Sequence, residues 1–441
     1  MPPVPLGSDD RRATVEGRSM LYAAYEAQRV ALDGARAASR AALGGLDMLP
    51  AALAGLEPVR RLRAAHQVFV DSAVTHRRLP FGIDKVTVGS PEGPLTATAA
   101  GTPTGTVAVT EEVVARTPFC TLLRFSKEMP DGATPQPRVL LVAPMSGHFA
   151  TLLAHTVRTL LPDHDVHVTD WHNAREVDLA HGPFGLDEMI DHVIGFLQEL
   201  GPRSHVVAVC QPCVPVLAAV ALMAEDRHIA QPASMTLMAG PVDVEVGETS
   251  VNALARTVPS EVFRDALVTA VPPPHAGVGR PVYPGFLQLA GFVAMNPQRH
   301  VDAHVGLVEA LVAGDRTRAR ATREFYDEYL AVADLPAEVY LDTIEQIFRH
   351  NRLARGGLTW RGRPVRPGRI TRTGLLTVEG ERDDICGPGQ TMAAHDLCPR
   401  IPAYRRRHHL QPGVGHFGVF SGRRWEGQVA PVVRAFVAAN S

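Results

Sequence analysis

The sequence predicts an α/β protein with a mostly parallel sheet covered by helices on both faces. Short apolar, strand-like segments recur along the chain, and between Arg138 and Gly240 they alternate with helical patterns. These strand-like segments are also apolar almost throughout, as expected of strands that are buried on both faces of a parallel sheet. Two further features are expected: an N-terminal helical segment and an inserted helical lid.

The expected elements can be assigned in chain order. Apolar spacing predicts amphipathic helices from Met20 to about Leu43 and over residues 51–73. β-rich runs predict strands over residues 83–89, 119–125, 138–144, 165–170, 205–210, 234–240 and 374–380. Helical patterns fill the intervals 150–161, 187–200 and 214–225.

These patterns divide the chain into five parts. Residues 1–19 are polar and are expected to be disordered, and residues 20–82 form the N-terminal helical segment. The core is expected in two parts, 83–243 and 373–441, separated by an insertion over 244–372. The insertion holds ten of the 25 aromatic residues. They favour a small helical subdomain with its own core, a lid with an apolar inner face, or both.

Composition excludes several classes of function. The net charge is −2 and no run of like charges is present, which argues against nucleic-acid binding. No apolar stretch reaches the roughly 18 residues of a membrane span, and the N-terminus lacks the apolar core of a secretory signal. Five cysteines do not form a disulfide framework. We therefore expect a cytoplasmic protein with reduced thiols and no resident metal or cofactor. Homo-oligomer formation is left open.

A pair of cysteines in VVAVCQPCVP (206–215) is the first candidate site. Redox C-x-x-C pairs lie after a strand at a helix N-terminus, but those of thioredoxin-like folds belong to short chains. A zinc site would need two more ligands, and Cys386 and Cys398 are too far apart for a second C-x-x-C clip. Only His395, three residues before Cys398, favours a metal. Both alternatives are weakly supported.

A nucleophile on a sharp strand-to-helix turn is the third interpretation of this segment. Such turns have compact residues two positions before and after the nucleophile, here Ala208 and Pro212 around Cys210. The glycines of the G-x-S-x-G motif are absent. The context is favourable, because an apolar strand precedes Cys210 and the helical pattern VPVLAAVALMAE follows it. We therefore predict Cys210 as a catalytic nucleophile.

An activating base and its orienting acid are expected later in the chain. In α/β-hydrolases the order is nucleophile, acid, histidine. Asp383 lies three residues beyond Gly380, where a loop leaves the strand GLLTVEG, and Asp384 and Asp243 are rival acids. His416 follows the last strand-like segment in a glycine-bounded loop. The predicted acid and base are therefore Asp383 and His416.

An oxyanion hole requires two backbone N–H groups near the nucleophile. One is expected from Gln211, the residue after the nucleophile, and the other from the loop APMSGHF after the strand at 138–144. We place the second donor at Ser146, with Met145 as the next choice. The alternative is an ordinary turn in which Ser146 caps the following helix.

These motifs resemble a known family over most of the chain, from about Met20 to the C-terminus. The segments VLLVAPMSGHFATLLAHTVRTLLPDHDVHVTDW, VCQPCVPVLAA, VYPGFLQLAGFVAMNP, FYDEYLAV, TVEGERDDICGPGQT and GHFGVFSGRRW resemble the intracellular polyhydroxyalkanoate (polyhydroxybutyrate) depolymerases. The resemblance implies an α/β-hydrolase with a cysteine nucleophile at Cys210, an acid at Asp383 and a base at His416. The family usually has threonine where this chain has Cys213, so a redox-sensitive pair with Cys210 is expected.

The resemblance also implies an activity and a partner. The expected reaction is cleavage of ester bonds in poly(3-hydroxybutyrate) granules through a 3-hydroxyacyl thioester, which is passed to water or to coenzyme A. The N-terminal helix and the aromatic insertion are expected to contact the granule, so the protein would lie in the cytoplasm at granule surfaces. Two alternatives stay open: a polyhydroxyalkanoate synthase, which usually carries glycines around its cysteine, and a non-catalytic granule-coat protein.

Overall fold

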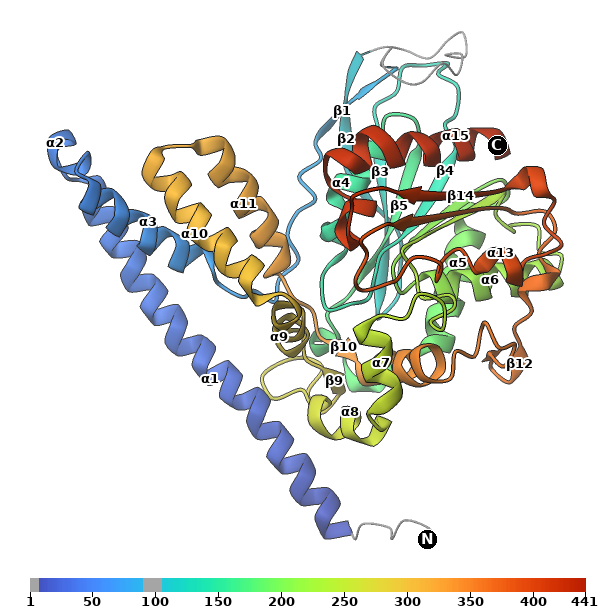
Figure 1. Ribbon diagram of the computed structural model, residues 1–441, viewed down its shortest axis with the longest axis horizontal. Coiled ribbons are helices and arrows are strands. Elements are labelled where there is room, and N and C mark those ends of the chain that lie inside the picture. Colours follow the sequence, from blue (N-terminus) through green and yellow to red (C-terminus); the bar gives the residue numbers. More distant parts are fainter. Residues whose placement is uncertain (1–7, 90–104) are drawn as a thin grey trace.

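The computed structural model describes residues 8–89 and 105–441, with side chains from Met20 onward. A nine-stranded sheet with the order β1-β2-β3-β5-β4-β6-β7-β13-β14 forms its centre (Figure 1). Its strands are β1 (Lys85–Val88), β2 (Gly105–Arg116), β3 (Cys120–Lys127), β4 (Arg138–Val142), β5 (Asp165–Trp171), β6 (His205–Val209), β7 (Ser234–Met238), β13 (Gly374–Gly380) and β14 (Arg406–Gln411).

The strand directions and order confirm the predicted α/β-hydrolase fold. From β5 to β14 all neighbouring strands pair in parallel, whereas β1, β2 and β3 pair antiparallel at one side. Helices α5 (Leu186–Leu200) and α6 (Cys213–Glu225) cover one face, and α4 (Ala154–Leu160) and α15 (Ala430–Asn440) cover the other (Figure 1). The central strands β6 and β7 are buried at every residue, as their continuous apolar sequences require.

The strand β2 is absent from the sequence-based prediction. It spans 12 residues, but most of its side chains are exposed, and it carries Glu111 and Glu112 at its centre. A strand whose one buried residue is Val109 lacks the period-2 apolar alternation that identifies half-buried strands. Its long pairing with the apolar strand β3 fixes its conformation, and that contact is invisible in the local sequence.

The N-terminal helices differ from their predicted limits. Helix α1 spans Ser8–Asp47 and so begins before the predicted start at Met20, within the residues 1–19 for which disorder is expected, and residues 1–7 lie outside the described range. This stretch contains no proline and a single glycine, so helix propensity lets α1 continue to Ser8. The second predicted helix is broken at Gly55 into α2 (Ala51–Ala54) and α3 (Glu57–Asp71), which has Pro58 in its first turn.

The chain between β7 and β13 forms two groups of elements. Helices α10 (Pro297–Ala313) and α11 (Arg316–Tyr329) form a hairpin that packs with α3, which in turn packs with α1, at the left of Figure 1. The remaining elements lie at the lower end of the sheet in the same view. They are α7 (Ser250–Thr257), α8 (Ser260–Leu267), β8 (Thr269–Ala270), β9 (Pro281–Tyr283), α9 (Gly285–Met295), β10 (Leu335–Pro336), α12 (Ala337–Asp342), the π-helix η4 (Thr343–Arg349), β11 (Thr359–Trp360) and β12 (Arg363–Pro364).

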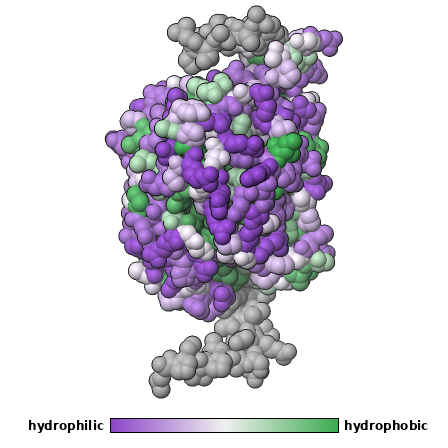
Figure 2. Space-filling view, turned by 90° about the vertical axis from the view of Figure 1, so that its right-hand side faces the viewer, coloured by the Kyte–Doolittle hydropathy of each residue, from purple (hydrophilic) through white to green (hydrophobic). Residues whose placement is uncertain are grey.

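The described surface is mixed in character. Figure 2 shows the face on the right-hand side of Figure 1, where hydrophilic residues predominate and hydrophobic residues are scattered. None of the helices in the described ranges combines the length and the hydropathy that a membrane span requires.

Candidate active site

The predicted site residues gather at the carboxyl ends of parallel strands, where open α/β sheets bind their ligands. Cys210 follows β6 directly, and the loop with Met145 and Ser146 follows β4. Asp383 lies just after β13, and His416 opens a short 3-10 turn, η7 (His416–Val419), after β14. Four loops from strands far apart in sequence thus meet at one edge of the sheet.

Cys210 stands on a sharp turn between β6 and α6. Its φ of 65° lies in the left-handed region, which is strained for a residue other than glycine. Its amide donates to the Met238 carbonyl over 2.8 Å, and its carbonyl accepts from the Cys213 amide over 3.1 Å. These bonds hold Cys210 between the end of β6 and the first turn of α6, which is the geometry of a nucleophile elbow.

Gly240 makes this turn possible by its lack of a side chain. A Cβ at Gly240 would lie 2.2 Å from both Cβ and Sγ of Cys213 and 2.8 Å from the Cys210 carbonyl oxygen. The loop after β7 therefore packs directly against the turn that presents Cys210.

Replacing Gly240 with alanine should damage both the turn and the fold. We expect the free energy of unfolding to fall by about 1–3 kcal/mol, because the added methyl group overpacks a rigid backbone contact. Esterase activity should fall further than stability explains, since the turn carries Cys210. The matched control is Gly195→Ala in α5, where an added Cβ meets no atom within 4 Å. Denaturant unfolding measures the loss of stability, and ester hydrolysis measures the loss of activity. Equal losses in the Gly240 variant and its control would contradict this packing role.

Asp383 is the predicted acid that reaches His416. Its Oδ2 lies 2.8 Å from Nδ1 of His416, and its Oδ1 accepts from the amides of Ile385 and Cys386, each over 2.9 Å. The rival acid Asp243 instead accepts hydrogen bonds from the Asn351 side chain and from a backbone amide of its own loop. The other rival, Asp384, is exposed and lies at the rim of the site. With Asp383 accepting at Nδ1, the imidazole has its Nε2 free for the sulfur.

His416 is buried and contacts both neighbours. Burial alone lowers the pKa of His416, but the charges of Cys210 and Asp383 and its hydrogen bonds to both side chains raise that pKa well above its ordinary value. Cys210 and His416 line one narrow space, and His416 hydrogen-bonds to Asp383, so the predicted nucleophile, base and acid lie next to one another. An imidazole in this position can accept the thiol proton and hold it.

Two backbone segments offer N–H groups to an oxyanion. The amides of Gln211, Met145 and Ser146 have no backbone acceptor within the described part of the chain, and all three residues line the cavity at Cys210. The buried imidazole of His148 contacts the carbonyls of Tyr329 and Ser146 and so braces this loop. The following helical turn begins at Ala150 with Phe149 as its N-cap, so Ser146 does not cap it.

Gln211 is also tied to the insertion. Its Nε2 donates to the Thr343 hydroxyl over 2.5 Å, and that hydroxyl donates to the Val339 carbonyl over 2.7 Å. This contact links the turn at Cys210 to the π-helix η4 across 132 residues of sequence. Neither Thr343 nor His148 is singled out by the sequence. The loop APMSGHF contains His148, but no motif in the sequence predicts a role for Thr343.

A cavity of about 610 Å³ opens beside Cys210 under the insertion. Its wall is almost wholly apolar, and Cys210, Gln211 and Ser146 lie at one end. Half of the ten aromatic side chains in the insertion line it: Phe263, Tyr283, Phe292, Tyr340 and Phe348. Most binding pockets are apolar with a few placed polar groups, and this cavity has that character. The insertion thus covers the site with an apolar inner face, while its α10–α11 hairpin packs with α3 and reaches the site only on the His416 side.

The second cysteine of the C-x-x-C pair faces the core. All five cysteines are free, and Cys213 is fully buried, with its sulfur donating to the carbonyls of Ala208 and Met238. Burial raises the pKa of the Cys213 thiol well above its ordinary value. In the described ranges, no three His, Cys, Asp or Glu side chains are grouped as metal ligands. His395 contacts the Thr377 hydroxyl. The redox sensitivity of the Cys210–Cys213 pair stays a prediction.

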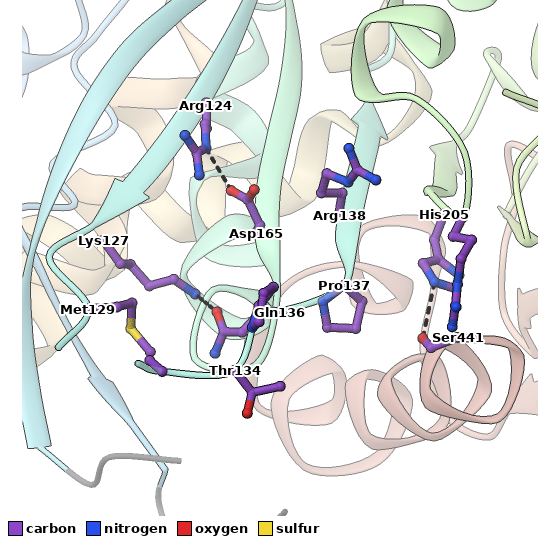
Figure 3. A pocket seen from close by; sticks show the side chains of 13 residues that line it. Arg124, Lys127, Met129, Thr134, Gln136, Pro137, Arg138, Asp165, His205 and Ser441 are labelled. Carbon is purple, nitrogen blue, oxygen red and sulfur yellow. Dashed lines mark hydrogen bonds and ion pairs between the residues drawn. The ribbon is translucent and has the colours of Figure 1, made fainter. Parts of the chain in front are cut away.

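A second large cavity, of about 570 Å³, lies at the opposite, amino-terminal end of the parallel strands (Figure 3). Its charged groups are largely occupied by the protein itself. Arg124 pairs with Asp165, and the Lys127 ammonium donates to Gln136 and to the carbonyls of Leu161 and His164. Burial lowers the pKa of Lys127 to about 8. This arrangement is a structural network, remote from the residues that follow β6, β13 and β14.

One known protein family matches the carboxyl-terminal part of the chain. Residues 239–441 match the family model described as "PHB de-polymerase C-terminus", a range that includes Asp383 and His416 and begins after Cys210. Among curated proteins, none matches the sequence.

Many solved structures are similar to this chain at low identity. A monoacylglycerol lipase from Paleococcus ferrophilus is 12% identical, with a TM-score of 0.41 over 70% of this chain and 97% of that chain. A thermophilic esterase from Thermogutta terrifontis is 13% identical, with a TM-score of 0.35 over 81% of this chain and 98% of that chain. The strand order itself establishes the α/β-hydrolase fold. Residues 239–441 thus match the carboxyl-terminal domain of polyhydroxybutyrate (PHB) depolymerases, and with the α/β-hydrolase strand order this match supports a carboxylic ester hydrolase.

Proposed function

We propose that the protein is a depolymerase that cleaves ester bonds of poly(3-hydroxybutyrate) with Cys210 as nucleophile. One observation carries the proposal: Cys210 stands on a strained turn at the end of an apolar cavity and shares a narrow space with a histidine that Asp383 holds. A thiol, a base and an acid in this order are what covalent acyl transfer requires. The apolar cavity suits a polyester whose backbone carries only methyl groups and ester groups.

The reaction proceeds in two halves. His416 accepts the proton of the Cys210 thiol, and the sulfur attacks the ester carbonyl carbon. The oxyanion accepts hydrogen bonds from the Gln211 amide and from Ser146 or Met145. As the carbon–oxygen bond breaks, His416 gives its proton to the leaving alkoxide, and a 3-hydroxyacyl thioester remains on Cys210. Water, deprotonated by His416, then attacks the thioester and frees the thiol and a 3-hydroxy acid.

Amorphous polyhydroxybutyrate granules test the proposal. The purified protein is expected to release soluble 3-hydroxybutyrate units from them, and Cys210→Ala is expected to release none above background. A soluble butyrate ester distinguishes a depolymerase from a general esterase. Hydrolysis of that ester without release from granules would disprove the polymer substrate. Release by Cys210→Ala at the wild-type rate would disprove the nucleophile.

The second half of the reaction has two acceptors in our proposal, water and coenzyme A. Transfer of the acyl group from one thioester to another is nearly balanced in energy, because the bond broken and the bond formed are of the same kind. With granules and added coenzyme A, we therefore expect 3-hydroxyacyl-CoA thioesters to form, including 3-hydroxybutyryl-CoA from chains cut to their last unit, as chromatography of the acid-quenched reaction would detect. No thioester product above background would leave water as the acceptor. Net chain growth from 3-hydroxybutyryl-CoA would instead indicate a synthase.

Granule contact is proposed for α1. Met20, Leu21 and Val30 expose large apolar side chains on this helix, whereas the face in Figure 2 is mainly hydrophilic. Replacing these three residues with serine is expected to reduce co-sedimentation with granules severalfold, because apolar area drives adsorption to an apolar surface. Tyr404→Ser removes an exposed aromatic ring outside α1 and serves as the control. Unchanged co-sedimentation of the triple variant would rule out this contact.

A further inference from the structure

A second pocket adjoins His416, which does not line the large apolar cavity. It measures about 220 Å³ and is lined by aromatic side chains together with Arg299, Arg382, His300 and Asp384. Arg299 and His300 come from the first turn of α10, and Arg382 and Asp384 flank Asp383. The pocket therefore combines residues of the insertion with residues of the loop that carries the candidate acid.

This pocket and the apolar cavity are connected across the candidate triad. A narrow space of about 40 Å³ lies between them and touches both Cys210 and His416. Phe292 and Ile385 border all three spaces. The order in space is apolar cavity, thiol, imidazole and arginine-lined pocket, so one extended substrate can cross the site from one end to the other.

The chemistry of ester cleavage assigns a role to each end. The imidazole must stand close to the leaving oxygen, because it donates the proton that this oxygen takes up. The leaving group therefore extends past His416 into the arginine-lined pocket, and the acyl group lies on the thiol side in the apolar cavity. In a polyester of hydroxy acids, the leaving group is itself a hydroxyacyl unit with its own carboxyl group.

The charges in the pocket favour one form of that unit. Arg299 and Arg382 form no ion pair with a carboxylate in the described part of the chain, although both are exposed at the pocket. Asp384 adds one negative charge to the two positive ones. A guanidinium offers several donors in a plane that matches a carboxylate. An internal polymer unit is uncharged at this position, whereas the last unit of a chain carries a free carboxylate.

We infer that Arg299 and Arg382 bind the terminal carboxylate of the substrate chain, so that the enzyme releases short hydroxy acids from the carboxyl end. This inference rests on the proposed function and identifies the part of the substrate that binds in the pocket. Each cleavage detaches the unit held by the arginines, and the shortened chain remains on Cys210 as a thioester until water or a thiol removes it. The newly formed acid then presents the next terminal carboxylate.

A matched pair of soluble substrates tests the inference. The linear trimer of 3-hydroxybutyrate is supplied as the free acid and as its methyl ester, which differ only in the terminal charge. The wild-type enzyme is expected to favour the acid in kcat/KM. Arg299→Gln and Arg382→Gln are each expected to lower the acid-to-ester ratio about tenfold, since each removes a charged hydrogen-bond donor. Asp384→Asn is expected to raise the ratio, and added salt to lower it in the wild type.

The control and the contrary outcomes separate the possible failures. Arg400→Gln removes an exposed arginine that does not line the pocket and should leave the ratio unchanged. Equal ratios in the wild type and both arginine variants, with both trimers still hydrolysed, would overturn the carboxylate site while leaving the depolymerase proposal intact. If the arginine variants lost only the transfer of the acyl group to coenzyme A, the carboxylate site would also be overturned, because the arginines would then bind the phosphates of coenzyme A. No hydrolysis of trimers or granules by the wild type would refute the proposed function itself.

Discussion

Replacing Cys210 with alanine is expected to lower kcat for ester hydrolysis by a factor on the order of 10⁶, the loss seen when a nucleophile is removed from a triad. The reason is that the substitution removes the sulfur that forms the acyl intermediate in the proposed reaction. The double variant Cys210→Ala/His416→Ala should be no worse than Cys210→Ala alone, because without a thiol the base has no proton to accept. Single-turnover kinetics on a soluble ester would measure both losses. Additive losses would show that the two residues do not act as a unit.

Two further variants separate chemistry from folding. Cys213→Ala removes a thiol three residues away that faces the core, and it should keep activity within a few-fold of the wild type. Cys210→Gly should be as inactive as Cys210→Ala but more stable by about 1 kcal/mol, because glycine adopts the φ of 65° without strain. Equal stability of the alanine and glycine variants would show that the turn stores no strain.

The sequence predicts the positions of the site residues because strand order constrains them. Cys210, Asp383 and His416 each follow a parallel strand, and the carboxyl ends of such strands share one edge of the sheet. Their convergence therefore follows once the strands are identified. Their catalytic roles stay predictions, because chain order and proximity do not measure reactivity.

The sequence alone does not determine whether Asp383 or Asp384 contacts the histidine. Two adjacent carboxylates leave the same strand, and the conformation of the loop decides which one faces inward. Here the amides of Ile385 and Cys386 turn back onto Asp383 and leave Asp384 at the surface. No local pattern predicts this turn, since either aspartate could accept such bonds.

Contacts from the insertion are the least predictable part of the site. Thr343 reaches Gln211, and Arg299 reaches the His416 side, only because separate helices of the insertion dock over the sheet. Their docking depends on apolar packing among many residues, which apolar periodicity does not specify. The same limit applies to β2, whose pairing partner rather than its own pattern determines its conformation.

Replacing Asp383 with asparagine is expected to lower kcat by a factor on the order of 10⁴, because the amide favours the wrong imidazole tautomer. Asp383 now accepts the Nδ1 proton over 2.8 Å, which leaves Nε2 to take the thiol proton. An asparagine that donates its own N–H would instead place the proton on Nε2 and block the transfer. Asp384→Asn is the matched control for this loss, since it removes an adjacent carboxylate that does not touch His416.

The same substitution has a signature in pH that a purely structural role would not produce. Asp383 is one of the groups that raise the pKa of buried His416 above its ordinary value, so the wild-type imidazolium persists to higher pH. The stability it contributes is complete below about pH 6.5, the ordinary value for histidine, and is lost only as pH rises through the raised pKa. In Asp383→Asn that pKa should fall, and the alkaline limb of kcat/KM should move to lower pH. NMR titration of the His416 ring would measure the shift, and an unchanged His416 pKa in Asp383→Asn would show that the carboxylate does not hold the proton in place.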